Sequence, residues 1–186
     1  MTGKAGGVEG RLVRPGKYAR VERERRFLLA GPPEPSAVTV SRLITDRYLE
    51  GTRLRLRWAE FPDGRREIKL TQKVPVARPG ATQGLLTNTY LSPAEYEVLA
   101  TLPARVLSKS RLSVPPLGVD VFEGRLRGLV LAEAEFTSDE EARSFLPPAV
   151  CVAEVTDDER FTGGRLVRAS RRELLGWLAE YGLRPE

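Results

Sequence analysis

The sequence predicts a mainly β (α+β) fold in which antiparallel strands form a sheet that closes, or nearly closes, into a barrel. Three observations lead to this prediction: apolar and polar residues alternate in many short runs, turn residues separate those runs at regular intervals, and few segments have helical periodicity. Regular spacing of strand and turn signals is typical of sandwiches and barrels. We therefore expect a few peripheral helices on an otherwise all-β framework.

The strand candidates alternate in side-chain character and end at turn residues. The first, Arg20–Leu29, stops at the turn sequence of residues 31–33, and Asp63-Gly64 between two later runs is a strong hairpin signal. The remaining candidates cover residues 38–49, 52–60, 65–74, 85–91, 105–113, 118–123, 129–136 and 150–155.

Three serine-led patterns mark where short helices begin. Ser92, Ser138 and Ser170 each stand three residues before a glutamate, which is the spacing of a capping box. Gly182 is the expected stop of the last helix. The apolar face of that helix, within residues 174–181, is expected to pack against the barrel.

Length and composition indicate a single globular domain that works inside the cell. The chain has 186 residues, of which 17–186 are assigned to the domain and 1–16, rich in glycine and without periodicity, to a flexible tail. No segment is apolar for long enough to span a membrane or to act as a signal peptide. The single cysteine cannot form an intrachain disulfide, so a cytoplasmic location is expected.

Charge and the lack of histidine restrict the chemistry. The chain contains no histidine, which excludes histidine-based triads, zinc sites and proton shuttles. Acids and bases in an active site must then be carboxylates, lysines, tyrosines or metal-bound water. The net charge of +5 favours an anionic partner, although the total alone does not identify it.

Charged side chains gather on one face of six predicted strands. Successive side chains of a strand point to opposite faces, so Arg55 and Arg57 share a face while Leu56 takes the other. The same alternation gives charged faces at Glu22/Glu24/Arg26, Glu67/Lys69/Lys73, Lys109/Arg111, Glu133/Glu135 and Glu154.

These faces have two interpretations. In an ordinary sheet each would face water, and for one strand taken singly that is the more common arrangement. Six strands with one pattern favour a charged interior, with the apolar faces turned outward and partly covered by helices. A charged interior is costly unless the charges pair and bind a ligand. A polyanion bound by Arg and Lys, with a divalent cation held by clustered carboxylates, meets that condition.

The motifs resemble those of a known family. The segment Glu22-Arg23-Glu24-Arg25-Arg26 resembles the Glu-x-Glu-x-Lys signature of the CYTH family, the triphosphate tunnel metalloenzymes. Segments similar to later motifs follow in the family's order, from about residue 18 to 168: Leu54–Arg57, Leu70–Lys73, Ser108–Arg111, Val119–Gly124, Leu131–Phe136 and Glu154–Thr156 with Arg160-Phe161.

This resemblance implies an eight-stranded antiparallel tunnel that acts on triphosphates with Mg²⁺ or Mn²⁺. Carried over position by position, it assigns metal binding to Glu24, Glu133, Glu135 and Glu154. It assigns catalytic roles to Glu22, Glu24 and Arg26, with Glu22 also on the metal side. Substrate phosphates are assigned to Arg55, Arg57, Lys73, Lys109 and Arg111.

The chain departs from the family pattern at two places. Arg26 stands where the signature usually has lysine, which keeps the charge but changes its geometry. Many members carry another acidic pair on the strand after the substrate lysine, whereas residues 86–91 here contain no carboxylate. A second metal, or the arrangement that activates water, is therefore in question.

Four functions remain under consideration. The first is metal-dependent hydrolysis of inorganic triphosphate or a related organic triphosphate. A class IV-type adenylate cyclase is the enzymatic alternative, although no adenine pocket is identifiable. A non-catalytic protein that binds polyphosphate or a nucleotide is the third. An RNA-binding β-domain is the least favoured, because aromatic residues interleaved with basic ones are sparse. The expected partner is a triphosphate, without membrane or nucleic acid, and the chain is expected to be a monomer or homodimer.

Overall fold

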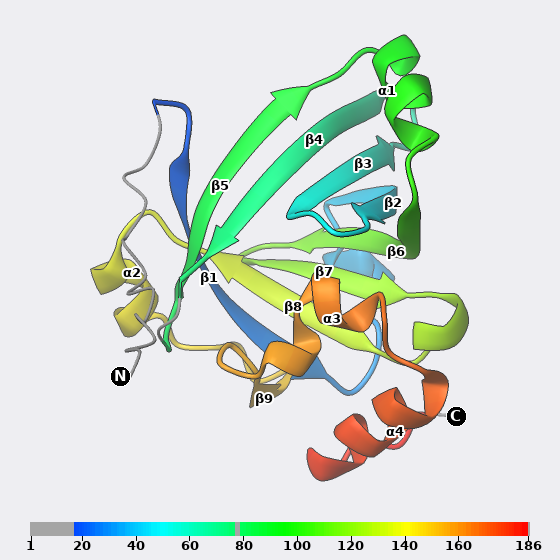
Figure 1. Cartoon of the computed structure of the whole chain (residues 1–186). Coiled ribbons are helices and arrows are strands. Elements are labelled where there is room, and N and C mark those ends of the chain that lie inside the picture. Colours follow the sequence, from blue (N-terminus) through cyan, green and yellow to red (C-terminus); the bar gives the residue numbers. More distant parts are fainter. Residues whose placement is uncertain (1–16, 77–78, 186) are drawn as a thin grey trace, which may run out of the picture.

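The computed structural model describes residues 17–76 and 79–185, and its elements are labelled in Figure 1. The strands are β1 (Arg20–Leu29), β2 (Val40–Leu49), β3 (Leu54–Glu60), β4 (Arg66–Pro75), β5 (Thr82–Tyr90), β6 (Ala104–Val114), β7 (Leu117–Phe122), β8 (Val130–Glu135) and β9 (Cys151–Glu154). The α-helices are α1 (Pro93–Ala100), α2 (Asp139–Ser144), α3 (Gly163–Leu166) and α4 (Arg171–Glu180), and the 3₁₀ turns are η1 (Pro35–Ala37), η2 (Gly124–Leu126) and η3 (Glu159–Phe161).

Eight antiparallel strands close into a barrel, which confirms the predicted mainly β fold. The strands follow the order β5-β4-β3-β2-β6-β7-β8-β1, and β1 pairs back onto β5. Each predicted strand is present within a few residues of its expected bounds. The predicted tail, residues 1–16, lies outside the described residues.

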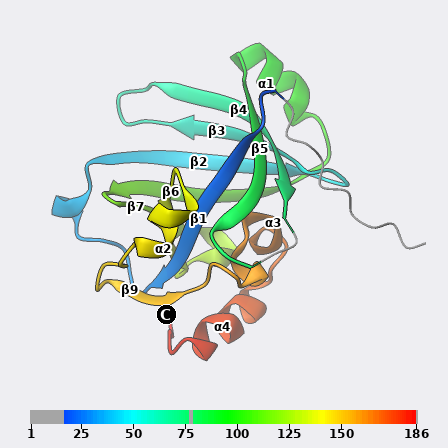
Figure 2. The same cartoon turned by 90° about the vertical axis from the view of Figure 1, so that its left-hand side faces the viewer.

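Strand β1 closes the barrel by pairing with two partners along the same edge. Its first residues pair with β5, and its last residues, from Phe27, pair with the short strand β9. Figure 2 shows β1 running diagonally, with β5 beside one part and β9 beside its end. Between the residues paired with these two strands, the backbone N–H of Arg26 donates to the Thr156 hydroxyl at 3.0 Å.

Most of the charged faces point into the barrel. Lys73 on β4 lies 2.5 Å from Glu22 on β1 although β5 separates these strands, so the pair spans the interior. Arg111 on β6 likewise reaches Glu133 on β8, past the intervening β7. The fold therefore agrees with the second interpretation of the alternating pattern, in which charged side chains line the interior of the barrel.

An apolar cluster closes one end of the barrel, and we call it the plug. Leu28 of β1 and Leu131 of β8 are paired at this end and pack with Phe161 of η3 and Leu166 of α3. Helix α4 covers the outside of the cluster with Leu174, and it lies beneath the barrel in Figure 1. The predicted packing of the last helix is thus confirmed, and the plug fills this end of the barrel. Toward the opposite end Glu135, on the same face of β8 as Glu133, is exposed, so among the described residues this is the accessible end.

The outer face carries a second apolar cluster. Phe27 and Ala132 pack there between β1 and β8, and Phe145, which follows α2, covers them. The predicted capping box at Ser138 is incomplete, because the Glu141 carboxylate accepts from Thr137 instead of from the Ser138 N–H. Helix α2 accordingly ends after six residues.

The other two serine caps form complete capping boxes, at Ser92 before α1 and at Ser170 before α4. Among the described residues, no helix combines the length and the apolar character that a membrane span requires.

Two adjacent glycines of the plug provide a matched test of its packing. A Cβ atom added to Gly163 would lie 2.0 Å from the Tyr48 hydroxyl oxygen, whereas one added to Gly164 would meet nothing within 4 Å. We expect Gly163→Ala to lower the free energy of unfolding by about 1–3 kcal/mol through overpacking. Gly164→Ala should leave it unchanged or raise it slightly. Urea unfolding of both variants checks this, and equal stabilities would contradict the described plug.

Candidate functional site

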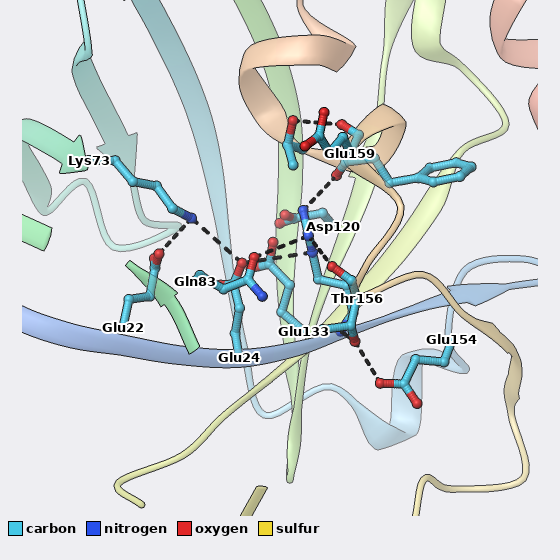
Figure 3. Close-up of polar contacts among 12 residues, drawn as sticks. Glu22, Glu24, Lys73, Gln83, Asp120, Glu133, Glu154, Thr156 and Glu159 are labelled. Atoms are coloured by element: carbon cyan, nitrogen blue, oxygen red, sulfur yellow. Dashed lines mark hydrogen bonds and ion pairs between the residues drawn. The ribbon is translucent and has the colours of Figure 1, made fainter. Parts of the chain in front are cut away.

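The barrel interior contains three groups of paired charges. The first joins β1 to β4, the second joins β6, β7 and β8, and the third joins β2 to β3. Figure 3 shows Glu22, Glu24 and Lys73 of the first group together with Asp120 and Glu133 of the second. Each group is described in turn, because its pairing decides which side chains can take a ligand.

The first group is a lysine held between two carboxylates of the Glu-x-Glu segment. The Lys73 ammonium lies 2.5 Å from Glu22 and 3.7 Å from Glu24. Glu22 and Glu24 are on the same face of β1 because they are two residues apart in a strand. The sequence therefore placed both glutamates and the lysine correctly on the interior face.

Glu24 is the least stabilised carboxylate of the interior. Its side chain is buried, and Glu133 and Glu22 add negative charge around it. Burial first and the Glu133 charge second raise the pKa of Glu24 to about 7, against the opposing charge of Lys73. A carboxylate in this situation gains stability from any added cation.

The second group is organised by Asp120, which is fully buried on β7. Its carboxylate accepts two hydrogen bonds of 2.6 Å from Arg111 and a further one from Lys109. Burial alone would raise the pKa of Asp120, but the Arg111 and Lys109 charges hold that pKa far below its usual range. Arg111 also donates to Glu133, so one guanidinium joins a structural carboxylate to an interior carboxylate near Glu24.

The third group is organised by Asp46, which is fully buried on β2. Its two oxygens accept hydrogen bonds of 2.7 Å from Arg57, and Arg55 lies 3.6 Å away. Burial alone would raise the pKa of Asp46, but Arg57 and Arg55 lower that pKa to about 2. Arg57 is therefore bound to a permanent anion, and the more exposed Arg55 is freer to meet a ligand.

Arg26 faces the interior but is directed toward the plug. Its guanidinium donates to the backbone oxygens of Thr156 at 2.6 Å and Phe161 at 3.3 Å, and to the Gln83 side chain at 3.2 Å. Only its Nε approaches the carboxylates, at 3.9 Å from Glu24. In this arrangement Arg26 anchors residues 156–161 beneath the charged interior.

Two of the four residues expected to bind metal are not joined to the interior carboxylates. Glu154 lies opposite Phe27 on the outer face and forms a bidentate pair with Arg25, at 2.6 and 2.9 Å. A position on β9, which pairs outside the closed barrel, explains this placement. Glu135 is opposite Glu24 in register, yet its side chain is exposed.

Strand β5 supplies neutral side chains to the interior. Leu86 pairs with Lys73, and Asn88 accepts a 2.7 Å hydrogen bond from Thr71. The missing acidic pair of this strand is therefore not replaced by another carboxylate at these positions.

The interior has the chemical groups for a divalent cation but not a closed binding site. Glu22, Glu24 and Glu133 are hard oxygen ligands whose negative charges affect one another. Within residues 17–76 and 79–185, however, no three acidic or cysteine side chains converge closely enough to hold one ion. Lys73 and Arg111 instead neutralise Glu22 and Glu133.

Comparisons with known proteins agree with this architecture. No family model matches the chain. An inorganic triphosphatase from Nitrosomonas europaea is 29% identical over 151 residues, which are 75% of this chain and 92% of that protein. The chain is a homologue of this inorganic triphosphatase, and that relative belongs to the CYTH family. The resemblance inferred from the motifs is thereby confirmed.

Comparison with solved structures leads to the same relative. Crystal structures described as the inorganic triphosphatase NE1496 and as the hypothetical protein NE1496 each match with a TM-score of 0.52. They are 25% and 28% identical, and both cover 80% of this chain. The matches cover 95% and 99% of those proteins, so the shared part is nearly their whole fold.

Sequence reasoning missed one structural acid of the triphosphatase homologue and left another undecided. The sequence alone leaves Asp120 undecided between a supporting carboxylate and a strand-end residue, and none of the motifs includes Asp46. Both stand on interior faces by strand alternation, opposite Arg111 and Arg57 in register. The sequence gives the face of the strand on which each aspartate lies, but it does not give the arginine partner, because that depends on which strands are neighbours.

Replacing Asp46 with asparagine tests the third group. Asp46→Asn leaves the buried Arg57 without its anion and should lower the free energy of unfolding by about 3–5 kcal/mol at pH 7. The folded-state pKa of Asp46, about 2, is below its ordinary 3.8, so this contribution is complete above about pH 4 and is lost as pH falls toward 2. The difference between wild type and variant should therefore shrink in acid.

The exposed pair Asp63–Arg65 provides the control. Asp63→Asn should change the free energy of unfolding by less than about 1 kcal/mol. Urea titrations from pH 7 to pH 2 measure both effects. An Asp46→Asn cost no larger than that of Asp63→Asn would contradict the buried pair.

Proposed function

We propose that this chain is a divalent-metal-dependent triphosphatase that hydrolyses inorganic triphosphate or a related organic triphosphate. The observation that carries the proposal is the cluster of Glu22, Glu24 and Glu133 facing Lys73 and Arg111 inside a closed barrel. Homology to an inorganic triphosphatase supports the reaction class. Mg²⁺ or Mn²⁺ is the expected metal, because carboxylate oxygens suit these ions.

The ion pairs inside the barrel could be replaced by contacts to a metal–triphosphate complex. Without ligand, Lys73 neutralises Glu22 and Arg111 neutralises Glu133. With a divalent cation held by these carboxylates, Lys73 and Arg111 would be free to contact phosphoryl oxygens. Each internal pair is then replaced by a carboxylate–metal and a base–phosphate contact, so no charge is left buried without a partner.

The remaining basic side chains divide into binding and supporting roles. Lys73, Arg111 and Arg55 would contact phosphoryl oxygens, because each reaches the interior and can leave or add to its present contact. Lys109 and Arg57 are bound to Asp120 and Asp46 and would orient the others.

Catalysis would rest on positioning and on charge. Glu22, Glu24 and Glu133 are the carboxylates that would hold the metal once Lys73 and Arg111 move away from them. The chemistry it would supply is neutralisation of phosphoryl oxygens and a lowered pKa of water. The basic side chains would fix the chain of phosphates in line for attack and stabilise the charge that develops on it. The plug prevents bulk water from entering behind the substrate.

A non-catalytic polyphosphate-binding protein is the second candidate. The specific observation in its favour is that β5 presents Leu86 and Asn88 where many relatives have an acidic pair. Such a protein would bind tripolyphosphate tightly without releasing orthophosphate. Assays for orthophosphate and for cyclic AMP separate hydrolysis, cyclisation and binding alone.

Glu24 and Glu154 form a matched pair for testing the activity. With Mg²⁺ or Mn²⁺, wild type should release orthophosphate from tripolyphosphate, and chelation should abolish this release. Glu24→Gln should lower kcat by at least about 100-fold because it removes an interior carboxylate next to the reacting phosphate. Glu154→Gln, on the outer face, should retain kcat within about twofold of wild type. Full activity in Glu24→Gln would refute the assigned site.

If these ion pairs are replaced on binding, the metal and tripolyphosphate should each strengthen the binding of the other. Because the metal releases Lys73 and Arg111 for the phosphates, each ligand should tighten the other's dissociation constant by the same factor, about 5–150-fold. Calorimetric titration of tripolyphosphate with and without Ca²⁺, used to limit turnover, measures this factor. Equal affinities in both titrations would refute the exchange.

A further inference from the structure

Arg42 faces the barrel interior from β2, at the end opposite the plug. Register pairs it with Arg111 of β6, so its side chain shares the inner face of β2 with Asp46 and Tyr48. Tyr48 packs against the plug. At the rise of about 3.3 Å per strand residue, Arg42 lies about 20 Å from Tyr48 along the strand. Its half-buried side chain therefore stands at the accessible end, which we call the mouth.

Arg42 differs from its neighbouring arginines in having no anionic partner. Arg57 and Arg111 each bind a buried aspartate through two hydrogen bonds. In the described part of the chain, no carboxylate lies within ion-pair distance of Arg42, whose guanidinium stands 5.7 Å from the centre of the Phe61 ring. Burial first and the Arg111 charge second lower the pKa of Arg42, against the opposing charges of Glu67 and Asp120, neither of which forms an ion pair with it. An anion next to this guanidinium would stabilise it.

The plug determines which part of a substrate can reach Arg42. Leu28, Leu131 and Phe161 close the other end of the barrel, so no bulky group can extend in that direction. A nucleoside joined to a triphosphate would therefore have to occupy the mouth. Inorganic triphosphate instead places a terminal phosphoryl group there, which carries more negative charge than an esterified one.

We propose that Arg42 binds the terminal phosphoryl group at the mouth and makes the protein prefer inorganic triphosphate to nucleoside triphosphates. This inference rests on the proposed function, because it assumes that triphosphate occupies the barrel. Phe61 supports the planar guanidinium from below, which leaves its N–H groups to form a forked contact with two phosphoryl oxygens.

The test compares the affinities of two ligands for three proteins. Dissociation constants of tripolyphosphate and ATP are measured by calorimetry in Ca²⁺ for wild type, Arg42→Gln and Arg172→Gln. Arg172 is exposed on α4, so Arg172→Gln removes the same charge away from the mouth. We expect Arg42→Gln to weaken tripolyphosphate binding about tenfold and ATP binding no more than about threefold. Arg172→Gln should match wild type.

Two further variants of Arg42 separate the effect of its charge from that of its shape and provide a substitute if the first variant does not fold. Arg42→Lys keeps the charge without the fork and should recover part of the preference for tripolyphosphate. If Arg42→Gln unfolds, Arg42→Met, which retains an apolar stem over Phe61, provides the same comparison. Thermal unfolding of each variant verifies that it is folded.

The possible outcomes separate this inference from the proposed function. If wild type binds neither ligand, the proposed function fails and this inference fails with it. If wild type binds tripolyphosphate and Arg42→Gln binds it equally well, only the inference is overturned. Equal weakening of both ligands would also overturn it, because Arg42 would then contribute charge without selectivity.

Discussion

The structure depends on burying acid–base pairs inside a closed barrel. Asp120 and Asp46 have no contact with solvent, and each is held by two hydrogen bonds from one arginine. Isolated charges in such a place would prevent folding, whereas pairs with several hydrogen bonds are tolerated. Asp120 and Asp46 orient Arg111 and Arg57 before any ligand arrives, whereas the separate contact of Arg111 with Glu133 can still be exchanged. The interior is therefore both a structural core and a preorganised surface for anions.

The two ends of the barrel have different physical character, and this difference gives the interior a direction. Apolar side chains from the C-terminal segment close one end, and Arg26 ties that segment to the charged region through backbone carbonyls. A guanidinium can reach two carbonyls at once, which an ammonium cannot do with the same geometry. The arginine at this position of the family signature thus has a structural reason in this chain. The mouth, in contrast, is polar and includes Arg42, which forms no ion pair with any of the described residues.

Negative charge near Glu24 is the least compensated feature of the interior. Burial and the neighbouring carboxylates raise the pKa of Glu24 to about 7, so the folded protein favours a proton or a cation at this point. Stability and function have opposite requirements here, as is common where a site is built from like charges. The bases Lys73 and Arg111 reduce the repulsion through contacts that a ligand can replace. These are the contacts that the proposed metal–triphosphate complex would replace.

The sequence by itself determined the strands, the face on which each charge lies and the family, because side-chain alternation and turn chemistry are local properties. It also identified Glu22, Glu24 and Lys73, which do meet in the interior. Only the tertiary structure decided that Glu154 lies outside and that Asp120 holds Arg111. These contacts join residues far apart in sequence, and they follow from strand order and barrel closure. The closed end was likewise beyond sequence reasoning, since an apolar helix face does not reveal the surface that it covers.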